Sequence, residues 1–398
     1  MTSRTTVIWD DGFTAYNFGP EHPMGPIRLD LTTRLLRAFG VFEGGGVTLH
    51  SPNPASEETL ATVHDPGYIA AVKHASVDPK TADVRRGLGT EDDPAFFGMH
   101  DISARIAQGT LEVCRQVWEG DADHGVNYCG GLHHAMKGNA SGFCIYNDIA
   151  VGIQWLLDNG AQRVCYIDID VHHGDGVESI FWNDPRVLTI SIHESGRVLF
   201  PGTGWPADIG GPQARGSAVN VALPPGTSDA AWLRAIDSVV LPLVHTWRPD
   251  ILVTQHGCDT HTHDPLAHLS ISLDAQVRAH ETLHSLAHEV SGGRWVALGG
   301  GGYSLVDVVP RSWTHLTAIA AHRPVGLDVE VPADWLRHVE DRLGVSGPSR
   351  MGDLSASERP IWVRPWAMGH NPDNPVDRAV MATREALFSL HGLDPWFD

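Results

Sequence analysis

Short apolar runs alternate along the chain with longer segments in which apolar residues recur every three or four positions. The short runs have the length and composition of buried strands, and they lie at residues 6–9, 164–167, 186–192, 250–255 and 294–298. The longer segments have helical spacing, and they lie at residues 28–39, 103–119, 149–157, 229–245 and 274–290. Repeated alternation of strand and helix predicts an α/β fold, in which a central parallel sheet is flanked by helices on both faces.

The periodic pattern fades after about residue 325, where the chain contains scattered prolines and tryptophans. We interpret about residues 325–398 as a C-terminal extension that packs on a catalytic core of about residues 10–320. One domain over residues 1–398 is therefore expected. Arg28, which begins the first helical segment, is interpreted as a structural charge at the surface end of that helix.

Composition narrows the classes of function. The chain has 398 residues, 42% of them hydrophobic, and a formal net charge of −20. This charge argues against nucleic-acid binding, which depends on Lys and Arg. No segment has the apolar length that a bilayer span needs, and the N-terminal segment lacks the apolar stretch of a signal peptide. Five cysteines occur singly, which fits a reducing compartment, so we expect a cytoplasmic protein without membrane contact.

The segment 163–176, RVCYIDIDVHHGDG, places polar groups at the end of an apolar strand. With a two-residue strand period, Asp168, Asp170 and His172 would share one face. A buried strand rarely carries two carboxylates, because an ionised carboxylate out of water needs a cation, a metal or several hydrogen bonds. A polar strand end or an Asp cap before a loop explains less of this pattern. The segment therefore indicates a site that holds a metal or moves protons.

Polar groups also follow two later strands. Asp259 comes after the strand at 250–255, and four glycines followed by Tyr303 come after the strand at 294–298. Functional groups of a parallel sheet gather beyond the carboxyl ends of its strands, so these residues should meet the polar end of segment 163–176. Two carboxylates and one imidazole would leave open positions for water and substrate, which is the layout of a catalytic metal site.

A glycine-rich loop upstream contributes the adjacent residues His133 and His134. Histidines are weak evidence singly, because a lone histidine is more often a surface or core residue than a catalyst. Beside a metal they could supply a general base and a general acid, with Asp168 and Asp175 as the carboxylates that orient the rings.

Several stretches resemble the successive signature blocks of the histone deacetylase superfamily: GLHHA, SGFCIYND, IDIDVHHGDG, SIHES, FPGTG, QHGCDTHTHDPLAH and LGGGGY. They are spread over about residues 10–320. The further stretches GLGTEDDP, WTHL and GLDP make the chain most similar to the bacterial acetoin-utilisation deacetylases of that superfamily. The resemblance implies the arginase/deacetylase α/β fold and hydrolysis of an acetylated amine.

The resemblance also implies two ion sites. It assigns the catalytic metal to Asp170, His172 and Asp259, with zinc (Zn2+) as the expected ion and ferrous iron (Fe2+) suited to the same ligands. A second, structural site for K+ or Na+ is implied at Asp168, Asp170, His172, Ser191 and Ile192.

For catalysis, the resemblance makes His134 the general base toward the attacking water, paired with Asp175. Asp168 keeps His133 in place. Tyr303 donates its hydroxyl to the substrate carbonyl and helps to stabilise the oxyanion.

The positions that match the substrate-binding residues of the superfamily are Asp92, Gly142, Phe143, Phe200, Leu266 and Gly301. Phe143 and Phe200 match the aromatic walls of an acyl-lysine tunnel, and Gly142 would let the methylene stem pass. Asp92 matches a rim carboxylate that holds the substrate backbone, although Glu91 and Asp93 are adjacent candidates.

Three other classes of protein share parts of this pattern. A binuclear manganese ureohydrolase of the same fold needs a second Asp two residues after Asp259, where this chain has His261. A non-catalytic binding module would require the loss of a ligand, the base or the tyrosine, and all are present. An acetylpolyamine amidohydrolase shares the whole catalytic set. We expect hydrolysis of Nε-acetyl-lysine in proteins, and the association with acetoin metabolism makes acetyl-CoA synthetase a candidate target.

Overall fold

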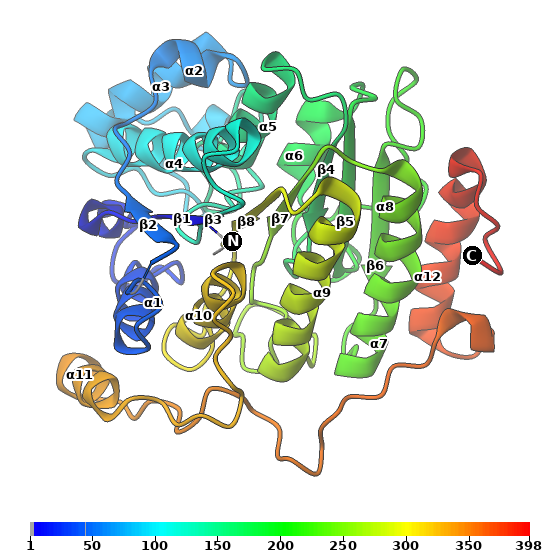
Figure 1. Cartoon of the computed structure of the whole chain (residues 1–398). Coiled ribbons are helices and arrows are strands. Elements are labelled where there is room, and N and C mark those ends of the chain that lie inside the picture. Colours follow the sequence, from blue (N-terminus) through cyan, green and yellow to red (C-terminus); the bar gives the residue numbers. More distant parts are fainter. Residues whose placement is uncertain (1–3, 44) are drawn as a thin grey trace.

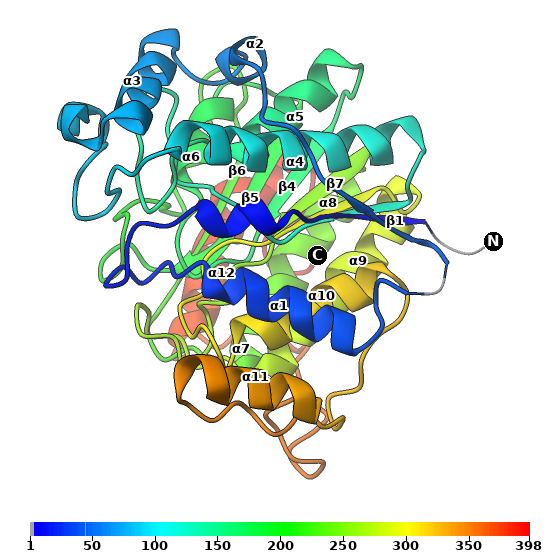
Figure 2. The same cartoon turned by 90° about the vertical axis from the view of Figure 1, so that its left-hand side faces the viewer.

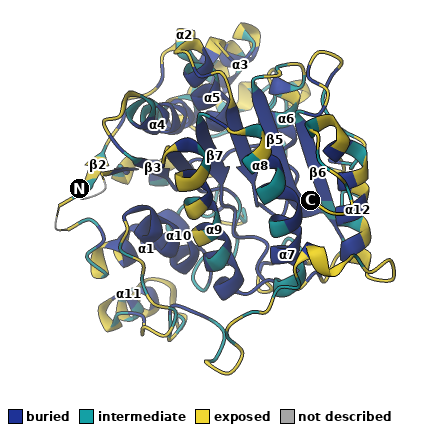
Figure 3. Cartoon of the chain, turned by 45° about the vertical axis from the view of Figure 1, so that its right-hand side comes forward, coloured by how far each residue is buried: buried dark blue, intermediate teal, exposed yellow. Residues whose placement is uncertain are grey.

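The protein, described here by a computed structural model over residues 4–43 and 45–398, is organised around one eight-stranded sheet. Every neighbouring pair is parallel, in the order β2-β1-β3-β8-β7-β4-β5-β6 (Figure 1). The strands are β1 (Thr5–Ile8), β2 (Val47–His50), β3 (His124–Asn127), β4 (Val164–Asp168), β5 (Val187–Glu194), β6 (Ala218–Leu223), β7 (Ile251–Gln255) and β8 (Trp295–Leu298). The central strands are buried along their whole length (Figure 3).

Helices cover both faces of the sheet. Figure 2 shows one layer above the sheet and a second layer below it. The first layer contains α2 (Glu57–Ala61), α3 (Pro66–Val77), α4 (Met99–Glu119), α5 (Asp148–Asp158) and α6 (Asp175–Phe181). The second contains α1 (Ile27–Ala38), α7 (Asp229–Ala235), α8 (Leu241–Trp247), α9 (Leu273–Ser291), α10 (Val309–Ala320) and α12 (Pro375–Leu387), while α11 (Ala333–Leu343) packs against α1. No helix in the described ranges is both long and apolar enough to cross a membrane.

The predicted α/β class and parallel sheet are confirmed, and each of the five predicted strands matches an observed one to within two residues. The helical segment 229–245 is one continuous helical stretch that contains a π-helical turn at Ile236–Val240. Three strands were not predicted. β3 and β6 each carry a buried asparagine within a short run, and β2 is partly exposed, so none of them shows an uninterrupted apolar signal.

The strand period that was predicted to run to His172 ends earlier. β4 stops at Asp168: Ile169 still donates to Gln255 of β7, but the following backbone N–H groups bond side-chain carboxylates in place of strand carbonyls. Asp168 accepts the backbone N–H of Asp170 at 3.1 Å, and Asp170 accepts that of His172 at 2.9 Å. Two successive turns therefore carry Asp170 and His172 out over the edge of the sheet.

The C-terminal region is more regular than its sequence indicated, since it contains α11 and α12. α12 lies against β6, where Thr383 donates its hydroxyl to the carbonyl of Asn220 at 2.6 Å. A buried ion pair joins Arg234 of α7 to Asp377 of α12 at 2.8 Å. Periodicity was hard to detect because α12 buries polar groups, including the ion-paired Asp377, on the face that packs.

The Arg234–Asp377 pair should contribute strongly to the docking of α12. We expect Asp377→Ala to lower the free energy of unfolding by about 3 to 5 kcal/mol, because it leaves the Arg234 guanidinium buried without its counter-charge. Urea unfolding followed by circular dichroism measures this change. Arg378→Ala, one residue further on the exposed side of the same helix, is the matched control and should change stability by less than about 0.5 kcal/mol. Equal effects of both substitutions would contradict the expectation.

Candidate active site

The predicted functional residues meet at the carboxyl ends of four neighbouring strands. His133 and His134 follow β3, Asp170 and His172 follow β4, Asp259 follows β7, and the loop ending in Tyr303 follows β8. These strands are adjacent in the order β3-β8-β7-β4, although they are far apart in sequence. The convergence therefore arises from the topology of the parallel sheet.

Asp170, His172 and Asp259 form a tight, buried triad. The His172 Nδ1 atom lies 3.1 Å from Asp170 Oδ1 and 3.1 Å from Asp259 Oδ2. One potential ligand atom from each residue lies within 4.8 Å of the others. Such an arrangement of two carboxylate oxygens and one imidazole nitrogen suits a divalent ion of the zinc or ferrous-iron type.

The remaining oxygens of the two carboxylates are held by the protein. Asp170 Oδ2 accepts hydrogen bonds from Gln255 Nε2 at 2.7 Å and from the Gly301 backbone at 2.8 Å. Asp259 Oδ1 accepts the Val171 backbone N–H at 2.9 Å. These bonds fix both carboxylates with their other oxygens toward His172, which preorganises the triad for an ion.

The pKa shifts of Asp259 and His172 show that the triad favours additional positive charge. Burial and the negative charge of Asp170 raise the pKa of Asp259 to about 7, so both carboxylates ionise fully at neutral pH only beside added positive charge. Burial opposes charge on His172, but both carboxylates outweigh it and raise the pKa of His172 to about 10. A divalent ion bound by these three residues would supply the missing positive charge in place of that proton.

Each of the paired histidines is held by its own carboxylate. His133 Nδ1 lies 2.7 Å from Asp168 Oδ2, and His134 Nδ1 lies 2.7 Å from Asp175 Oδ1. The two Nε2 atoms face each other at 3.0 Å. Asp168 and Asp175, the predicted orienting carboxylates, therefore contact His133 and His134 as expected. Each bond holds a proton on Nδ1, on the side of the ring away from the triad.

The two rings have opposite protonation preferences. Burial opposes charge on His133, but the carboxylates of Asp168 and Asp170 outweigh it and raise the pKa of His133 to about 9. Burial, reinforced by the charge on His133, lowers the pKa of His134 to about 4. His134 is thus the neutral ring of the pair at neutral pH, which is the form that accepts a proton.

Tyr303 lines a small cavity together with His133, His134, Gly142 and Gly301. Burial and the negative charges of Asp259 and Asp170 raise the pKa of Tyr303, so its hydroxyl stays protonated and can donate a hydrogen bond. Its orientation depends on a residue that the sequence analysis did not single out. Asp264 accepts the Tyr303 backbone N–H at 2.8 Å and that of Leu266 at 3.0 Å, and it lies within the quoted stretch QHGCDTHTHDPLAH.

Aromatic side chains border the site. Phe143 meets the Tyr303 ring edge-to-face with centroids 5.7 Å apart, and Phe200 meets the His134 ring at 5.0 Å. Phe200 is 44% exposed, so its ring reaches from the histidine to the surface. Gly142 has a positive φ of 56°, and an added Cβ would lie 2.3 Å from the His134 ring. Only glycine fits this close approach.

The acidic loop reaches the same region. Asp92 is half-buried and accepts the backbone N–H of Gly142 at 2.7 Å. Asp93 is fully buried and Glu91 is exposed. Of the three adjacent acids, Asp92 is therefore the one that bonds the aromatic-walled segment.

The residues predicted to hold a monovalent cation lie on adjacent strands. Asp168 of β4 is the direct register partner of Ser191 of β5, and Ile192 follows it. The Ser191 hydroxyl lies 2.8 Å from His193 Nδ1, and Asp168 accepts the Tyr166 hydroxyl at 2.6 Å. The structure thus brings Asp168, Ser191 and Ile192 together next to Asp170.

Arg28 is buried, contrary to its interpretation as a surface charge. Its guanidinium donates hydrogen bonds to the carbonyls of Gly300 and Gly302, both at 3.0 Å, and lies over the Trp313 ring. These carbonyls belong to the glycine loop that carries Tyr303. The burial of Arg28 was not predicted, because the helical spacing of residues 28–39 shows which positions are apolar. It does not show which loop packs against the helix.

Arg28→Met should loosen the glycine loop. We expect a loss of about 3 kcal/mol in the free energy of unfolding, since two buried carbonyls lose their donor, and a drop in kcat of about tenfold or more as Tyr303 loses its fixed position. Arg34→Met removes an exposed arginine from the same helix and is the matched control. Urea unfolding and steady-state kinetics of both variants measure the difference. Normal kcat for Arg28→Met would show that the loop holds Tyr303 without this anchor.

Comparison with known proteins gives the class to which this fold and site belong. The histone deacetylase domain matches residues 22–320. The chain belongs to the histone deacetylase family. Within it, the Acetoin utilization protein AcuC of Bacillus subtilis (strain 168) is 39% identical over 381 residues, which cover 95% of this chain and 97% of that protein. AcuC of Staphylococcus xylosus is 38% identical over 340 residues, which cover 84% and 87% of the two chains.

A solved structure supports the same conclusion. The crystal structure of an HDAC homolog complexed with SAHA has a TM-score of 0.82 and 25% identity, and the match covers 96% of this chain and 100% of that one. The predicted arginase/deacetylase fold and the resemblance to bacterial acetoin-utilisation deacetylases are confirmed. Membership of this family implies deacetylase activity, an acetylated substrate and a catalytic metal.

Proposed function

We propose that the protein hydrolyses Nε-acetyl-lysine in other proteins and releases acetate, using a divalent ion, zinc by default, held by Asp170, His172 and Asp259. One observation carries the proposal: two carboxylate-held histidines and a protonated tyrosine line one small cavity, and Gly301 of the same cavity donates its backbone N–H to Asp170 of the adjoining His172 triad. This is the set of groups that amide hydrolysis needs, namely a base, a site for a Lewis acid and an oxyanion donor.

The roles of the side chains follow from their surroundings. When bound, the ion supplies Lewis-acid polarisation of the carbonyl and lowers the pKa of the attacking water. His134, neutral and held through Nδ1 by Asp175, takes the proton from that water at Nε2. The histidine pair then returns a proton to the leaving amine nitrogen. Tyr303 donates its hydroxyl to the carbonyl oxygen, most strongly as negative charge develops there.

The borders of the site support a lysine side chain as the substrate. Phe143 and Phe200 provide apolar walls for its methylene stem, and Gly142 leaves room beside His134. Gly301 lines the small cavity, and half-buried Leu266 is joined through its backbone to Asp264, which also holds Tyr303. Val198 and Phe200 are 53% and 44% exposed, which offers an apolar surface to a protein partner. Asp92 would accept a backbone N–H of that partner.

The acidic loop supports a second candidate, hydrolysis of acetylpolyamines or other small acetylamines. Glu91 is exposed and Asp92 half-exposed, so two carboxylates could attract the distal ammonium groups of such a substrate. The test compares kcat/KM for acetylated acetyl-CoA synthetase, an acetyl-lysine peptide and acetylspermidine, with His134→Ala as the inactive control. We expect the protein or peptide to be preferred by about tenfold or more. Preference for acetylspermidine would overturn the assignment to protein substrates.

We further propose that Asp168, Asp170, His172, Ser191 and Ile192 hold K+ or Na+, and that residues 1–398 form one domain. The first is supported by the register of Asp168 with Ser191, and the second by the packing of α12 on β6. A dependence of thermal stability on KCl that choline chloride does not reproduce tests the ion site. A single urea transition for the whole chain tests the domain proposal.

A further inference from the structure

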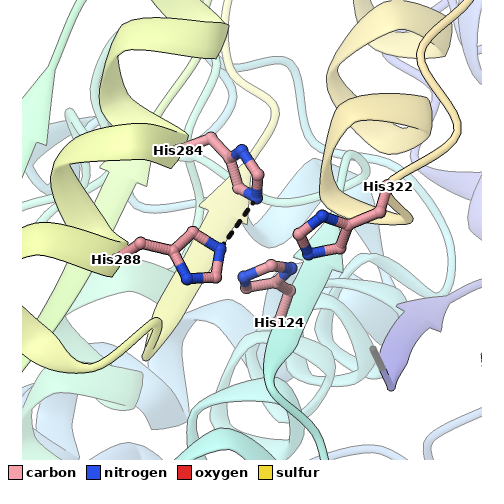
Figure 4. Close-up of side chains that lie close together, drawn as sticks. All are labelled: His124, His284, His288 and His322. Atoms are coloured by element: carbon pink, nitrogen blue, oxygen red, sulfur yellow. Dashed lines mark hydrogen bonds between the residues drawn. The ribbon is translucent and has the colours of Figure 1, made fainter. Parts of the chain in front are cut away.

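Four histidines gather at the end of the sheet opposite the active site (Figure 4). His124 is the first residue of β3, whereas the active-site loop follows the last residue of that strand. His284 and His288 lie one turn apart on α9, and His322 follows α10. One ring nitrogen from each lies within 4.8 Å of the others. Three separate elements therefore direct imidazoles to one point.

The ring of His124 has an unused lone pair. Its Nδ1 atom lies 2.8 Å from the carbonyl of Ala320, to which it donates, so Nε2 is the unprotonated nitrogen. Nε2 is buried and has no hydrogen-bond partner, although buried polar atoms are nearly always satisfied. The ring centroids of His284 and His322 lie 4.9 Å from that of His124. The orphaned nitrogen thus belongs to a ring surrounded by other imidazoles.

The pair on α9 has the spacing of a helical metal chelate. His284 and His288 are four residues apart, which places both rings on one face of the helix. Their Nε2 atoms lie 3.2 Å apart, a hydrogen bond when one ring carries its proton on Nε2 and a distance at which both nitrogens can share one ion when neither does. Burial and, to a smaller extent, the neighbouring histidines lower the pKa of His284 to about 3. Burial is also the main cause that lowers the pKa of His124 to about 4. Neutral imidazole is the form that binds metals.

Packing alone gives a less complete account of the cluster. The rings do contact Trp295, at 5.3 Å from His284 and 5.7 Å from His124, as in an ordinary aromatic cluster. Stacking, together with the hydrogen bond between His284 and His288, does not explain the buried Nε2 of His124, which has no partner. One ion at the centre of the four rings would give that nitrogen a partner and would explain why four ring nitrogens meet within 4.8 Å.

We propose that His124, His284, His288 and His322 form a second metal site, for a divalent transition-metal ion with affinity for imidazole, of which Zn2+ is the representative. Four neutral nitrogen ligands leave no open position on a tetrahedral ion, which is the arrangement of a structural rather than a catalytic site. The ion would join the start of β3 to the ends of α9 and α10. Asp123, next to His124, adds negative charge nearby.

The test measures zinc content in the full-length protein. Chelator-treated protein is equilibrated with low-micromolar Zn2+, and bound zinc per chain is determined for the wild type and for His288→Gln/His322→Asn. Both replaced residues are exposed, and Asn tolerates the positive φ of 54° at position 322, so the fold should be retained. His74→Gln, an exposed histidine on α3, is the matched control.

We expect the double variant to bind one equivalent less than the wild type and the control, with deacetylase activity unchanged. In cobalt-substituted protein, the visible absorption of tetrahedral Co2+ should fall in the double variant only. Zinc should also raise the melting temperature of Asp259→Asn, and this rise should disappear when the double substitution is added. Equal zinc content in the wild type and the double variant would overturn the proposal, whatever the occupancy of the site at Asp259.

Discussion

Asp259→Asn is expected to abolish turnover and to reduce zinc content by one equivalent per chain. The substitution keeps the size of the side chain and an oxygen that can still accept the Val171 N–H, but it removes one of the two negative charges facing His172. Affinity for a divalent ion should fall by at least about a hundredfold, because a charged ligand contributes more than the partners that merely orient it. Metal analysis in the His288→Gln/His322→Asn background isolates this site from the histidine cluster.

Asp175→Asn is the matched control for the charge. It removes a carboxylate that contacts His134 but none of the triad, so zinc content should stay normal while kcat falls. Full zinc occupancy in Asp259→Asn would exclude Asp259 as a ligand. Anaerobic reconstitution of the metal-free enzyme with Zn2+ or Fe2+ then determines which ion gives the higher kcat.

Tyr303→Phe should lower kcat by about a hundred- to a thousandfold, equivalent to about 3 to 4 kcal/mol, while affinity for an acetyl-lysine peptide changes little. The hydroxyl bonds a neutral carbonyl weakly in the ground state and a developing oxyanion strongly in the transition state. Zinc content should be unaffected, because the tyrosine is outside the triad. Single-turnover kinetics and peptide binding, measured beside His134→Ala, separate the two effects.

Tyr146→Phe is a suitable control, since it removes a buried tyrosine hydroxyl that contacts His100 and lies away from the triad. Its kcat should stay within about twofold of the wild type. A near-normal kcat for Tyr303→Phe would mean that the carbonyl is polarised without the tyrosine. The role given to the glycine loop would then have to be abandoned.

The groups that do the proposed chemistry were the most predictable part of the molecule. Asp170, His172 and Asp259 each follow an apolar run, so a parallel sheet of any strand order that keeps those runs adjacent brings them together. Residues that act through the backbone were not predictable in this way. Arg28 bonds two glycine carbonyls and Asp264 bonds the Tyr303 N–H, and no spacing in the sequence marks a side chain whose partner is a distant peptide group.

In the secondary structure too, features set by a local apolar pattern were predictable, and features set by distant contacts were not. Long periodic helices were predicted well, because tertiary packing reinforces one clear apolar face: α9 was predicted to within one residue at each end, and α4 to its last residue but without its first turn. β3 was missed because it is four residues long and begins with His124, whose burial depends on α9 and α10. The end of β4 was misplaced because Asp168 and Asp170 bond the following backbone, which local alternation does not reveal.

The strand order also governs when the active site can assemble during synthesis. β3, which precedes His133 and His134, never touches β4, which precedes Asp170; β8 and β7 lie between them. The ribosome must therefore release residues up to Leu298, the end of β8, before a continuous sheet can join the histidine loop after β3 to the triad after β4 and β7. Until then the first half of the chain exposes an unpaired strand edge, the kind of surface that chaperones shield. Fragments that end before Trp295 contain the whole triad on the adjacent strands β4 and β7, but they lack the strand that joins it to His133 and His134.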